Sequence, residues 1–492
     1  MRAIWAYLIL FLVLSACSGT GAESEAEFAP TCIEDLSGHS VALPGGSSTD
    51  LLVSGYPGID IMRVSLGDIP IAVKSGRADF GLLQEVQFDA NQMARQGFKK
   101  YFAGILPGSG AIAFRKDDVA LCDEFNHFLR AMKASGEYDR WYNCWLHNLD
   151  SMTVEAGKRP APQEGKKLIV GITLAHPYIF LQQDAITGIE PDLMNLFCRS
   201  AGYSPEYVII QFPALIPSLN ANKIDLILSH LLVTPERAKQ VLFSDEYMEG
   251  GLCCFGVNPQ WGASGGQGIW TRTKEGIRHN LIEEDRWKLL GNGLIVTLEL
   301  SLLSLLVAIL LGILLCYLRM RPNAVISGTT RVFVDVVRGI PVLVILMIMF
   351  YVIFAKVNMS GVAVSIFGFG LFFGACFSEV FRSGMMSVDN GQWEAGAALG
   401  LNKMQTFRLV AFPQALRRII PVFKGEVIAL IKSTSIVGYV AVLDLTCVGD
   451  IIRTRTLDAF FPLILVSIIY IILSRLSGGL LDALDRKLNA SK

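Results

Sequence analysis

The sequence predicts an α/β domain followed by an all-α membrane domain of five transmembrane helices, and two observations on composition support this fold class. Hydrophobic residues make up 52% of the 492 residues and charged residues only 18%, which is too apolar for a fully soluble protein. Charged residues are frequent up to about Lys288, and long apolar segments dominate after it. A chain of this length also exceeds one ordinary domain, so two or three structural units are expected.

The charge balance and the motifs exclude several classes of function. Forty-three basic and forty-four acidic residues leave a net charge of −1, so nucleic acid is not an expected partner. The ten cysteines show no close metal-ligand spacing, so we expect no metal site. His176 and His230 lie in no G-x-S-x-G, H-E-x-x-H or paired-carboxylate pattern, so we expect no catalytic residues and no enzyme.

The second half contains five apolar segments that are long enough to cross a membrane. From Leu300 to Leu318 there is no charged residue, and nineteen residues at 1.5 Å each span about 28 Å. The other four segments lie near Val332–Phe354, Val362–Phe381, Val422–Leu443 and Phe460–Leu481.

Basic residues predict the orientation of these segments. They follow the first segment (Arg319, Arg321), the third (the loop Lys403–Arg418) and the fifth (Arg486, Lys487). By the positive-inside rule these three places are cytoplasmic. We therefore expect a multi-pass protein of the bacterial cytoplasmic (inner) membrane, with the residues before about 290 outside and the C-terminus inside.

Residues 1–17 have the features of a lipoprotein-type signal peptide. Arg2 supplies the positive end and Leu8–Leu14 the apolar core. This core is short for a hydrocarbon layer of about 30 Å. The stretch Leu14–Cys17 also looks like a bacterial lipobox, which predicts acylation of Cys17 and attachment to membrane lipid. An uncleaved anchor and a plain signal peptide are the alternatives.

Two cysteines of the exported half are candidates for a disulfide. Cys122 opens a predicted helix, Cys144 ends the next one, and Gly136 breaks the chain between them. An antiparallel helix pair would bring these ends together. A disulfide that closes such a loop contributes about 3 kcal/mol to stability. Two free buried thiols are the alternative.

The cytoplasmic loop between residues 394 and 421 is predicted to form a compact helical elbow. Glu394–Leu399 favours a short helix, Gly400 permits a sharp turn, and Asn402 can cap a second helix. Pro413 and Pro421 are expected to end that second helix. Its apolar side chains alternate with basic ones, which suits docking into a groove of another protein.

The same loop resembles the EAA coupling loop of ABC-importer permeases, in the subgroup that handles polar amino acids. The similarity extends from Gly291 to Leu488, and Gly396 departs from it because it stands where the family has its second alanine. The loop residues that match the family pattern are Glu394, Ala395, Leu399, Gly400, Gln405, Phe407, Pro413, Gln414, Ala415, Leu416, Arg417 and Pro421.

This resemblance implies a permease domain over residues 291–488 that works as a pair, either as a homodimer or with a second permease. It also implies that Glu394 and Gly400 sit in a cleft of an ABC ATPase subunit. The sequence contains no G-x-x-x-x-G-K-[ST] loop, so ATP would be used by that partner subunit and no cofactor is expected here.

Several ionisable residues fall in or near the predicted spans, where a charge is costly and usually faces a cavity or a partner. They are Glu299, Glu379, Glu426, Lys432 and Asp444. The stretch Lys432–Ser435 resembles a segment of the permease family near the translocation path. Glu426 and Lys432 are therefore candidates for the translocation path, and the alternative is that they pair with each other.

Residues 168–260 alternate β-rich runs with amphipathic helices, which predicts an α/β unit. Thr234 is a good N-cap and Pro235 suits the first helical position, so a short helix that carries Arg237 is expected. A helix N-terminus beside an arginine is a natural carboxylate site, because guanidinium binds carboxylate with two parallel hydrogen bonds. An ordinary capped helix on the surface is the alternative.

This unit resembles the first lobe of type II solute-binding proteins. The resemblance implies that Arg237 holds the α-carboxylate of the ligand, next to Thr234, and that Tyr178 packs on the ligand's side chain. The segments that match are His176–Phe180, Gly188–Asp192, Ala214–Leu219, Lys223–Asp225, Thr234–Arg237 and Phe243–Tyr247.

Residues 28–150 resemble the second lobe and the closing helices of the same two-lobed, periplasmic-binding-protein-like fold. The stretch Gly46–Thr49 would present backbone and hydroxyl donors, which makes Ser47 and Ser48 candidate ligand contacts. Because the lobes stand in reversed order, we infer a circularly permuted domain. Its halves are joined by a linker at 151–167, and a second linker at 261–290 precedes the permease domain. Exchange of lobes between two chains of a dimer is the alternative.

The expected pocket residues limit what the sequence says about the solute. Many relatives have an aspartate for the α-ammonium where this chain has Gln84 followed by Glu85, and His230 and Leu232 replace a usual glycine and threonine. A polar amino acid is the expected solute, and another small carboxylate or a peptide fragment is the alternative. A ligand-gated channel or receptor is a further alternative, although the sequence has no evident re-entrant pore segment.

Overall fold

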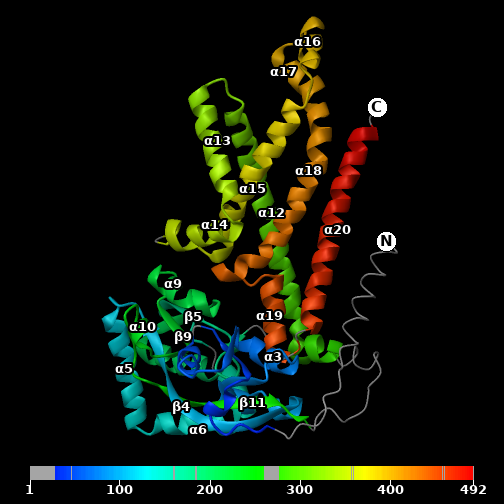
Figure 1. The fold of residues 1–492 in the computed structure, drawn as a ribbon. Helices are drawn as coiled ribbons and strands as arrows, with labels where there is room; N and C mark the ends of the chain where they lie inside the picture. The colour runs from blue at the N-terminus through cyan, green and yellow to red at the C-terminus, as the bar shows by residue number, and fades with distance from the viewer. Residues whose placement is uncertain are drawn as a thin grey trace.

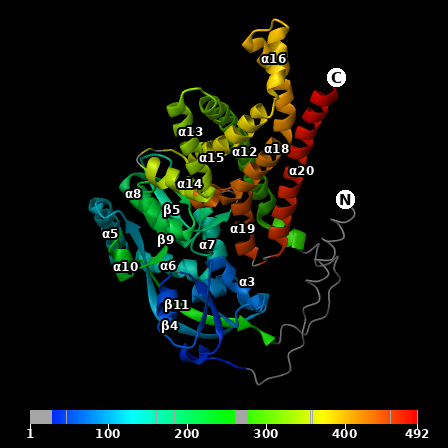
Figure 2. The same cartoon turned by 45° about the horizontal axis from the view of Figure 1, so that its top comes forward.

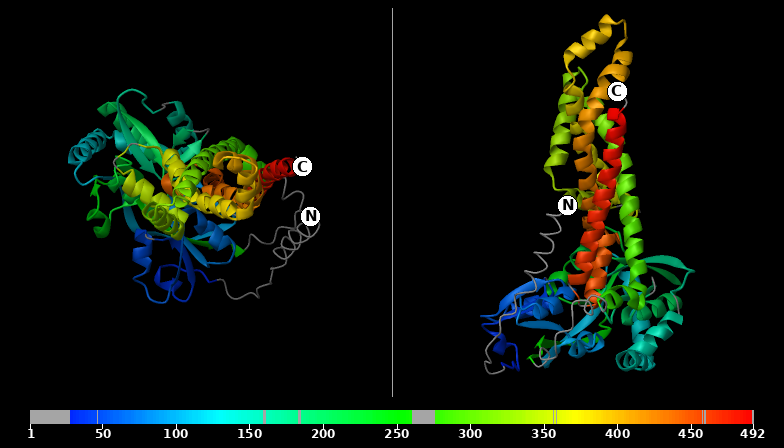
Figure 3. Two further views of the ribbon diagram at one scale, coloured as in Figure 1. Left: turned by 90° about the horizontal axis from the view of Figure 1, so that it is seen from above. Right: turned by 90° about the vertical axis from the view of Figure 1, so that its right-hand side faces the viewer.

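The computed structural model describes residues 28–490 except 46, 159–160, 183–184, 260–275, 356, 358, 457 and 459. Residues 28–257 form an α/β part, and the helices from residue 286 onward form an elongated bundle that stands on it (Figure 1). The other views agree that the α/β part lies at one end of this bundle (Figure 2 and Figure 3). The predicted signal peptide and Cys17 lie outside the described residues.

The α/β part is built on one mixed sheet. Its strands are β1 (Ser40–Pro44), β2 (Asp60–Val64), β3 (Phe80–Gln84), β4 (Phe98–Phe114), β5 (Lys166–Ile172), β8 (Tyr203–Ile209), β9 (Leu226–Leu232), β10 (Leu242–Phe243) and β11 (Met248–Val257). They follow the order β2-β1-β3-β11-β4-β9-β5-β8, with β10 paired to β4. A separate small sheet pairs β6 (Phe180–Gln182) with β7 (Ala185–Thr187).

The long antiparallel strands β4 and β11 join two lobes. The end of β4, Gly110–Phe114, pairs with β9 and β10, whereas its earlier part pairs only with β11, which pairs in turn with β3. Lobe 2 therefore contains β1, β2 and β3, and lobe 1 contains β5, β8, β9 and β10. Both lobes are formed by this one chain, and lobe 2 comes first in the sequence.

Short helices follow the strands in both lobes, as expected of α/β units. One contact fixes the helices after β4 to lobe 1: Nε1 of Trp141 and of Trp145 both donate to Oδ2 of the buried Asp192, at 2.9 and 3.0 Å. The helices of the α/β part are α2 (Ser48–Val53), α3 (Ile69–Lys74), α4 (Glu85–Ala90), α5 (Val119–Ala134), α6 (Glu137–His147), α7 (Leu149–Lys158), α8 (Ile189–Ala201), α9 (Leu215–Asn220) and α10 (Pro235–Ala238).

The predicted disulfide between Cys122 and Cys144 is wrong, because both residues are free cysteines. Cys122 is buried on α5, with its Sγ 3.5 Å from the carbonyl oxygen of Phe243, whereas Cys144 is exposed on α6. The two helices do pack against each other, but one thiol faces lobe 1 and the other faces solvent. The alternative of two free thiols is therefore right, although only Cys122 is buried.

The helical part contains three helices that are long and apolar enough to cross a membrane: α12 (Arg286–Arg319), α15 (Gly361–Met386) and α20 (Phe460–Ala490). Two bent pairs pass the same test together. They are α13 (Ala324–Gly339) with α14 (Val342–Ile348) and its extension to Ile353, and the stretch Lys403–Val440 with α19 (Leu445–Thr456). The described residues thus hold three candidate spans, or up to five if each bent pair is one span.

The second and fourth predicted spans are therefore not straight helices. The second bends by 104° at Ile340-Pro341, where Pro341 has no N–H to continue the helix. The fourth begins as α18 (Phe412–Ser433), passes into a tighter 3-10 segment at Thr434–Val440, and meets α19 at a bend of 58°. After these bends, α14 lies across the end of the bundle next to the α/β part, and α19 runs down to that part (Figure 1).

The predicted elbow lies at the end of the bundle remote from the lobes (Figure 1). Helix α16 (Asn390–Ala398) ends just before Gly400, which has a φ of +78° that favours glycine. Asn402 caps α17 (Lys403–Thr406) as predicted, and it does so through a capping box with Gln405. The prediction that Pro413 and Pro421 end the second helix is wrong. Pro413 lies in the first turn of α18, where no backbone donor is needed, and Pro421 is accommodated inside that helix.

Candidate functional site

A cavity of about 660 Å³ lies between the two lobes and the helical part. Ligand pockets usually measure about 300–1,000 Å³, so this cavity has the size of a small-molecule site. Each of the three regions contributes polar residues to its wall: Ser47, Thr49 and Gln84 from lobe 2, Tyr178, His230 and Arg237 from lobe 1, and Tyr439, Asp450 and Arg453 from the helical part.

Arg237 lies on the short helix α10, as predicted. The Oγ1 of Thr234 accepts from the backbone N–H of Arg237 at 3.3 Å, which caps the helix. The guanidinium donates through Nη1 to the carbonyl oxygen of Leu232 at 3.0 Å and lies over the ring of Phe212 at 5.5 Å. These contacts hold the cation at the cavity wall, and burial lowers the pKa of Arg237 from its usual value.

Tyr178 links the two lobes across the cavity. Its buried hydroxyl donates to Oε1 of Gln84, a residue of lobe 2, in a short hydrogen bond. Its ring stacks on the imidazole of His230 with a centroid distance of 4.7 Å. Burial raises the pKa of Tyr178 well above its usual value, so the hydroxyl stays a donor. The lobes are therefore closed against each other at this point.

A buried acid lies behind His230, and the sequence did not reveal its role. Glu190 is fully buried, accepts from the hydroxyl of Tyr247 at 2.6 Å, and lies 3.7 Å from Nδ1 of His230. Burial raises the pKa of Glu190 to about 7 and lowers that of His230 to about 4. A Cβ at Gly110 would lie 2.7 Å from Nδ1 of His230, so the ring needs glycine there.

The imidazole of His230 has polar atoms to offer a ligand. Its two ring nitrogens have no hydrogen-bond partner among the described residues, and its side chain is only 7% exposed. A buried polar atom without a partner is costly unless a ligand or water supplies one. Its φ of +41° is also unusual for a residue other than glycine.

Only some of the ligand contacts predicted in lobe 2 lie in the described wall of the cavity. Ser47 lines the cavity and caps α2, since its Oγ accepts from the N–H of Asp50 at 3.2 Å. Ser48 begins α2, and its side chain lies outside the described part. Gln84 lines the cavity, whereas Glu85 is not in its wall and pairs with Nζ of Lys100 at 3.0 Å.

The wall formed by the helical part was not expected from the sequence. Arg453 of α19 binds Asp68 of lobe 2 through Nη1 in a short ion pair, and binds Asp450 through Nη2 at 3.1 Å. A Cβ at Gly67 would lie 2.0 Å from Cγ2 of Thr454, so lobe 2 touches α19 directly. No motif marks these residues, because they meet only when the lobes pack on the bundle.

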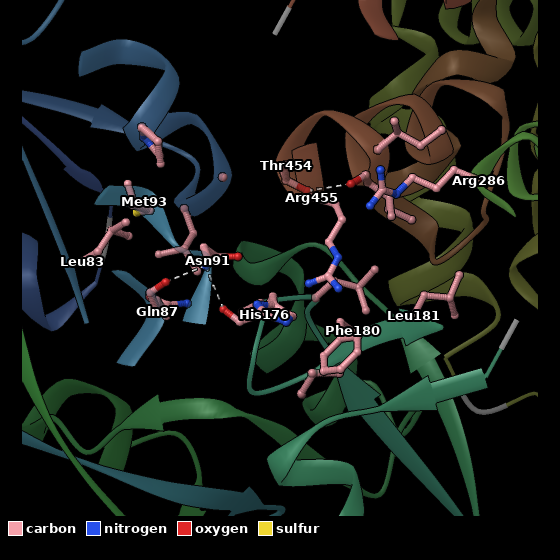
Figure 4. A pocket seen from close by; sticks show the side chains of 18 of the residues that line it. Leu83, Gln87, Asn91, Met93, His176, Phe180, Leu181, Arg286, Thr454 and Arg455 are labelled. Carbon is pink, nitrogen blue, oxygen red and sulfur yellow. Dashed lines mark hydrogen bonds between the residues drawn. The ribbon is translucent and has the colours of Figure 1, made fainter. Parts of the chain in front are cut away.

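A smaller cavity of about 90 Å³ shares part of this wall (Figure 4). Figure 4 shows Arg455 directed toward the ring of Phe180, and its guanidinium carbon lies 4.9 Å from the ring centroid. Asn91 donates to the carbonyl oxygens of Gln87 and His176, at 2.7 and 3.4 Å. Burial, and secondarily the charge of Arg455, lowers the pKa of His176 well below its usual value.

The described residues hold no group of three or more His, Cys, Asp or Glu side chains that could bind a metal ion. Within the bundle, Glu379 forms ion pairs with Arg319 and Arg382. Asp444 is buried, and its carboxylate accepts from the N–H groups of Thr446 and Cys447 at 3.0 Å, so it caps α19. Two of the ionisable residues noted in the sequence thus have local structural partners.

The two candidates for the translocation path both lie on α18. Glu426 and Lys432 are six residues apart, a spacing that does not place them on the same side of a helix. The structure shows no ion pair between these two described residues, and neither lines either cavity described above. Their role in the path stays a prediction.

The elbow presents the two predicted coupling residues at the surface. Glu394 is exposed on α16, and Gly400 is exposed in the turn that follows. A Cβ at Gly396 would lie 2.5 Å from Cγ2 of Thr406. Glycine therefore replaces the family's alanine because Thr406 fills that space.

The fold and the cavity define a solute receptor joined to a membrane permease. Residues 305–490 match the family described as binding-protein-dependent transport system inner membrane component, and residues 168–259 match bacterial extracellular solute-binding proteins, family 3. The chain belongs to the first of these families, the permeases of ABC importers, and carries a solute-binding domain in the same polypeptide. This confirms both predicted resemblances.

Several similar proteins are named as permeases of transport systems. The L-cystine transport system permease protein TcyB of Bacillus subtilis is 31% identical over 215 residues, which cover 43% of this chain and 92% of that protein. The probable amino-acid ABC transporter permease protein YckA of the same species is 30% identical over 196 residues, which cover 40% of this chain and 87% of that protein. A crystal structure of an amino acid ABC transporter with histidines is 27% identical and covers 45% of this chain and all of its own, with a TM-score of 0.39.

Proposed function

We propose that this chain captures a polar amino acid outside the membrane and passes it through its own membrane domain. The observation that carries the proposal is the shared cavity, in which Arg237 of the closed lobes and residues of α19 line one space. Arg237 would bind the α-carboxylate with two parallel hydrogen bonds, and Tyr178 would pack on the solute's side chain. The relatives named for L-cystine and for amino acids support this class of solute.

The solute-binding domain is, in this proposal, circularly permuted within one chain. The strand order supports the permutation, because the strands of lobe 2 precede those of lobe 1 in the chain while β4 and β11 run between the lobes. Exchange of lobes between two chains would instead pair β4 with the β11 of a partner. The expected linker at 151–167 is partly helical here, since α7 extends to Lys158, and β5 begins at Lys166.

The proposed transport cycle begins with the lobes closed around the solute on α19. Fusion makes this docking intramolecular, at an effective concentration on the order of millimolar for a short linker. Two copies of the chain, or this chain and a second permease, would form the path near Glu426 and Lys432. A separate ABC ATPase would bind the elbow around Glu394 and Gly400, and ATP binding there would turn access inward.

The same proposal places the protein in the inner membrane with five spans, each bent pair counting as one. The lobes would be outside, and the elbow and the C-terminus inside. The positions of the lobes and the elbow at opposite ends of the bundle support this orientation (Figure 1). Removal of the signal peptide and acylation of Cys17 would tether the N-terminus to the outer surface of that membrane.

Calorimetry with the full chain in nanodiscs tests the proposal. The twenty L-amino acids and several dicarboxylates are titrated, and we expect tight binding of a polar amino acid. Arg237→Ala should lower that affinity about 100-fold, because it removes a charge-assisted bidentate contact. Arg95→Ala is the matched control, since Arg95 is exposed on lobe 2 and hydrogen-bonds Gln92 at 3.0 Å. Equal affinity of the wild-type protein and Arg237→Ala would refute the site.

A further inference from the structure

The charges around the main cavity are arranged in two opposed groups. Arg237 presents a cation from lobe 1, and Arg63 of lobe 2 is already paired with Asp50 at 2.9 Å. The carboxylates in the described wall of the cavity are those of Asp68 and Asp450, and both are bound to the single cation of Arg453. Because these two carboxylates share one guanidinium, this group carries one more negative charge than positive charge, opposite the cation of Arg237.

The two carboxylates differ in how much of them is accessible. Arg453 and Asp68 have side chains that are 16% and 22% exposed, whereas the side chain of Asp450 is 46% exposed while it lines the cavity. A carboxylate offers about four acceptor sites, and Arg453 occupies only one side of Asp450. Asp450 is therefore the acid that can accept further hydrogen bonds from a molecule in the cavity.

We propose that Asp450, a residue of the membrane domain, binds the ammonium group of the solute, so that the binding site is complete only when the lobes are seated on α19. This inference rests on the proposed amino acid solute and deepens it. Lobe 2 has the neutral Gln84 where many solute-binding relatives have an aspartate, and Glu85 is bound to Lys100 outside the wall. The unpartnered ring nitrogens of His230 give an independent sign that the cavity receives a polar ligand.

The arrangement has a consequence for release. Asp450 belongs to the bundle, whereas Arg237 belongs to lobe 1, so the two ends of a zwitterion would be held by parts of the molecule that can separate. When the lobes lift from α19, the ammonium contact is lost and only the carboxylate contact stays. High affinity would then require the seated receptor, which couples capture of the solute to docking.

Ligand pairs that differ only in the ammonium group test this inference. The full chain in nanodiscs is titrated with each of the twenty L-amino acids and with the desamino carboxylic acid of the same side chain. For the amino acid that binds most tightly, we expect Asp450→Asn to lower affinity at least about 30-fold, the size of a lost hydrogen-bonded charge contact. Affinity for its desamino acid should change less than about twofold, so the variant's preference for the amino acid disappears.

Two further variants keep the outcome interpretable. Asp450→Glu retains the charge and should recover part of the preference for the amino acid. Asp335→Asn is the control: it alters an exposed acid of α13 that lines neither cavity described here, so both affinities should stay as in wild type. Retained binding of the desamino acid shows that Asp450→Asn is folded. An unchanged preference in Asp450→Asn, or a wild-type protein without any preference, would overturn the inference alone. Absence of binding by all twenty amino acids would overturn the proposed solute and this inference together.

Discussion

The two ends of the helical part differ in what covers them. At the end that carries the lobes, α19 is covered by them, with Gly67 against Thr454 and Asp68 bound to Arg453. At the other end, the elbow leaves large apolar side chains uncovered, and Leu399, Met404 and Leu409 are 79%, 66% and 66% exposed. Clustered exposed apolar residues mark interaction sites. The chain thus covers one end of the bundle with its own lobes, whereas apolar side chains are exposed at the other end.

The largest expected effect comes from a charge reversal at the uncovered end. Glu394→Arg should lower uptake by cells that hold the complete importer more than about 100-fold, because it places a cation in the surface that the ATPase would bind. Solute binding should stay within about twofold of wild type, since α16, the helix that carries Glu394, lies at the end of the bundle remote from the lobes (Figure 1). Radiolabelled uptake and calorimetry measure the two effects separately.

Asp117→Arg is a matched control for that reversal. Asp117 is exposed in the turn before α5 and lies in neither cavity wall described here, so uptake should stay close to wild type. Normal uptake by Glu394→Arg would contradict the assignment of the elbow as the coupling site.

At the covered end, lobe 1 keeps two titratable groups out of water, and their contributions to stability change with pH in opposite directions. Glu190 has a pKa of about 7 in the folded domain and 4.5 as its ordinary value, so the stability it contributes is complete below pH 4.5 and is lost as pH rises through 7. His230 has a pKa of about 4 against 6.5, so its contribution is present above pH 6.5 and is lost as pH falls through 4. In the wild-type domain, Glu190 and His230 therefore change the unfolding free energy with pH in opposite directions.

Single substitutions separate these two pH dependences. As pH falls from 7 to 4, the unfolding free energy of Glu190→Gln should decrease by up to about 3 kcal/mol relative to wild type. In this variant the pH dependence due to His230 is no longer offset by that of Glu190. As pH rises from 4.5 to 7, the unfolding free energy of His230→Gln should decrease by up to about 3 kcal/mol, because the pH dependence due to Glu190 is no longer offset by that of His230. Urea unfolding of the binding domain in the full chain measures both. Slopes of the same sign in the two variants would show that the pair does not titrate in this way.

A methyl group at the contact between lobe 2 and α19 should disturb the seating of the receptor. A Cβ at Gly67 would overlap Cγ2 and Cβ of Thr454, at 2.0 and 2.6 Å, and overpacking of this kind costs about 1–3 kcal/mol. Gly67→Ala should therefore increase hydrogen exchange in α19 and lower uptake several-fold. The double variant Gly67→Ala with Thr454→Gly should recover both.

Gly157→Ala is the matched control, because its added Cβ meets no atom within 4 Å. Failure of Thr454→Gly to recover the seating would mean that the direct contact does not hold lobe 2 on the bundle.

The smallest expected effect concerns the thiols. Maleimide should label Cys144 quickly and Cys122 only after unfolding, because burial shields Cys122 and raises its pKa to about 11. The unfolding temperature of the binding domain under reducing conditions should stay within about 1 °C of its value without reductant, since no disulfide joins these cysteines. Mass spectrometry of labelled peptides checks the first point, and a clear drop in unfolding temperature on reduction would contradict the second.

The sequence alone determined those features that depend on neighbouring residues. The apolar segments of the bundle, the cap of α10 by Thr234, and the turn at Gly400 followed by the Asn402 capping box all follow from local propensity and periodicity. The short helix that carries Arg237 forms as predicted, because it is defined by its own four residues.

Only the tertiary structure decided how distant segments meet. Local patterns did not predict the 104° bend at Pro341, the continuation of α18 through Pro421, or the orientation of Cys144 toward solvent, since packing overrides propensity at those points. The wall of the cavity between lobe 2 and the helical part depends on Asp68 and Arg453, which lie 385 residues apart in the chain. A contact between residues so far apart leaves no periodic signal in the sequence, because it arises from the docking of two domains and not from either domain alone.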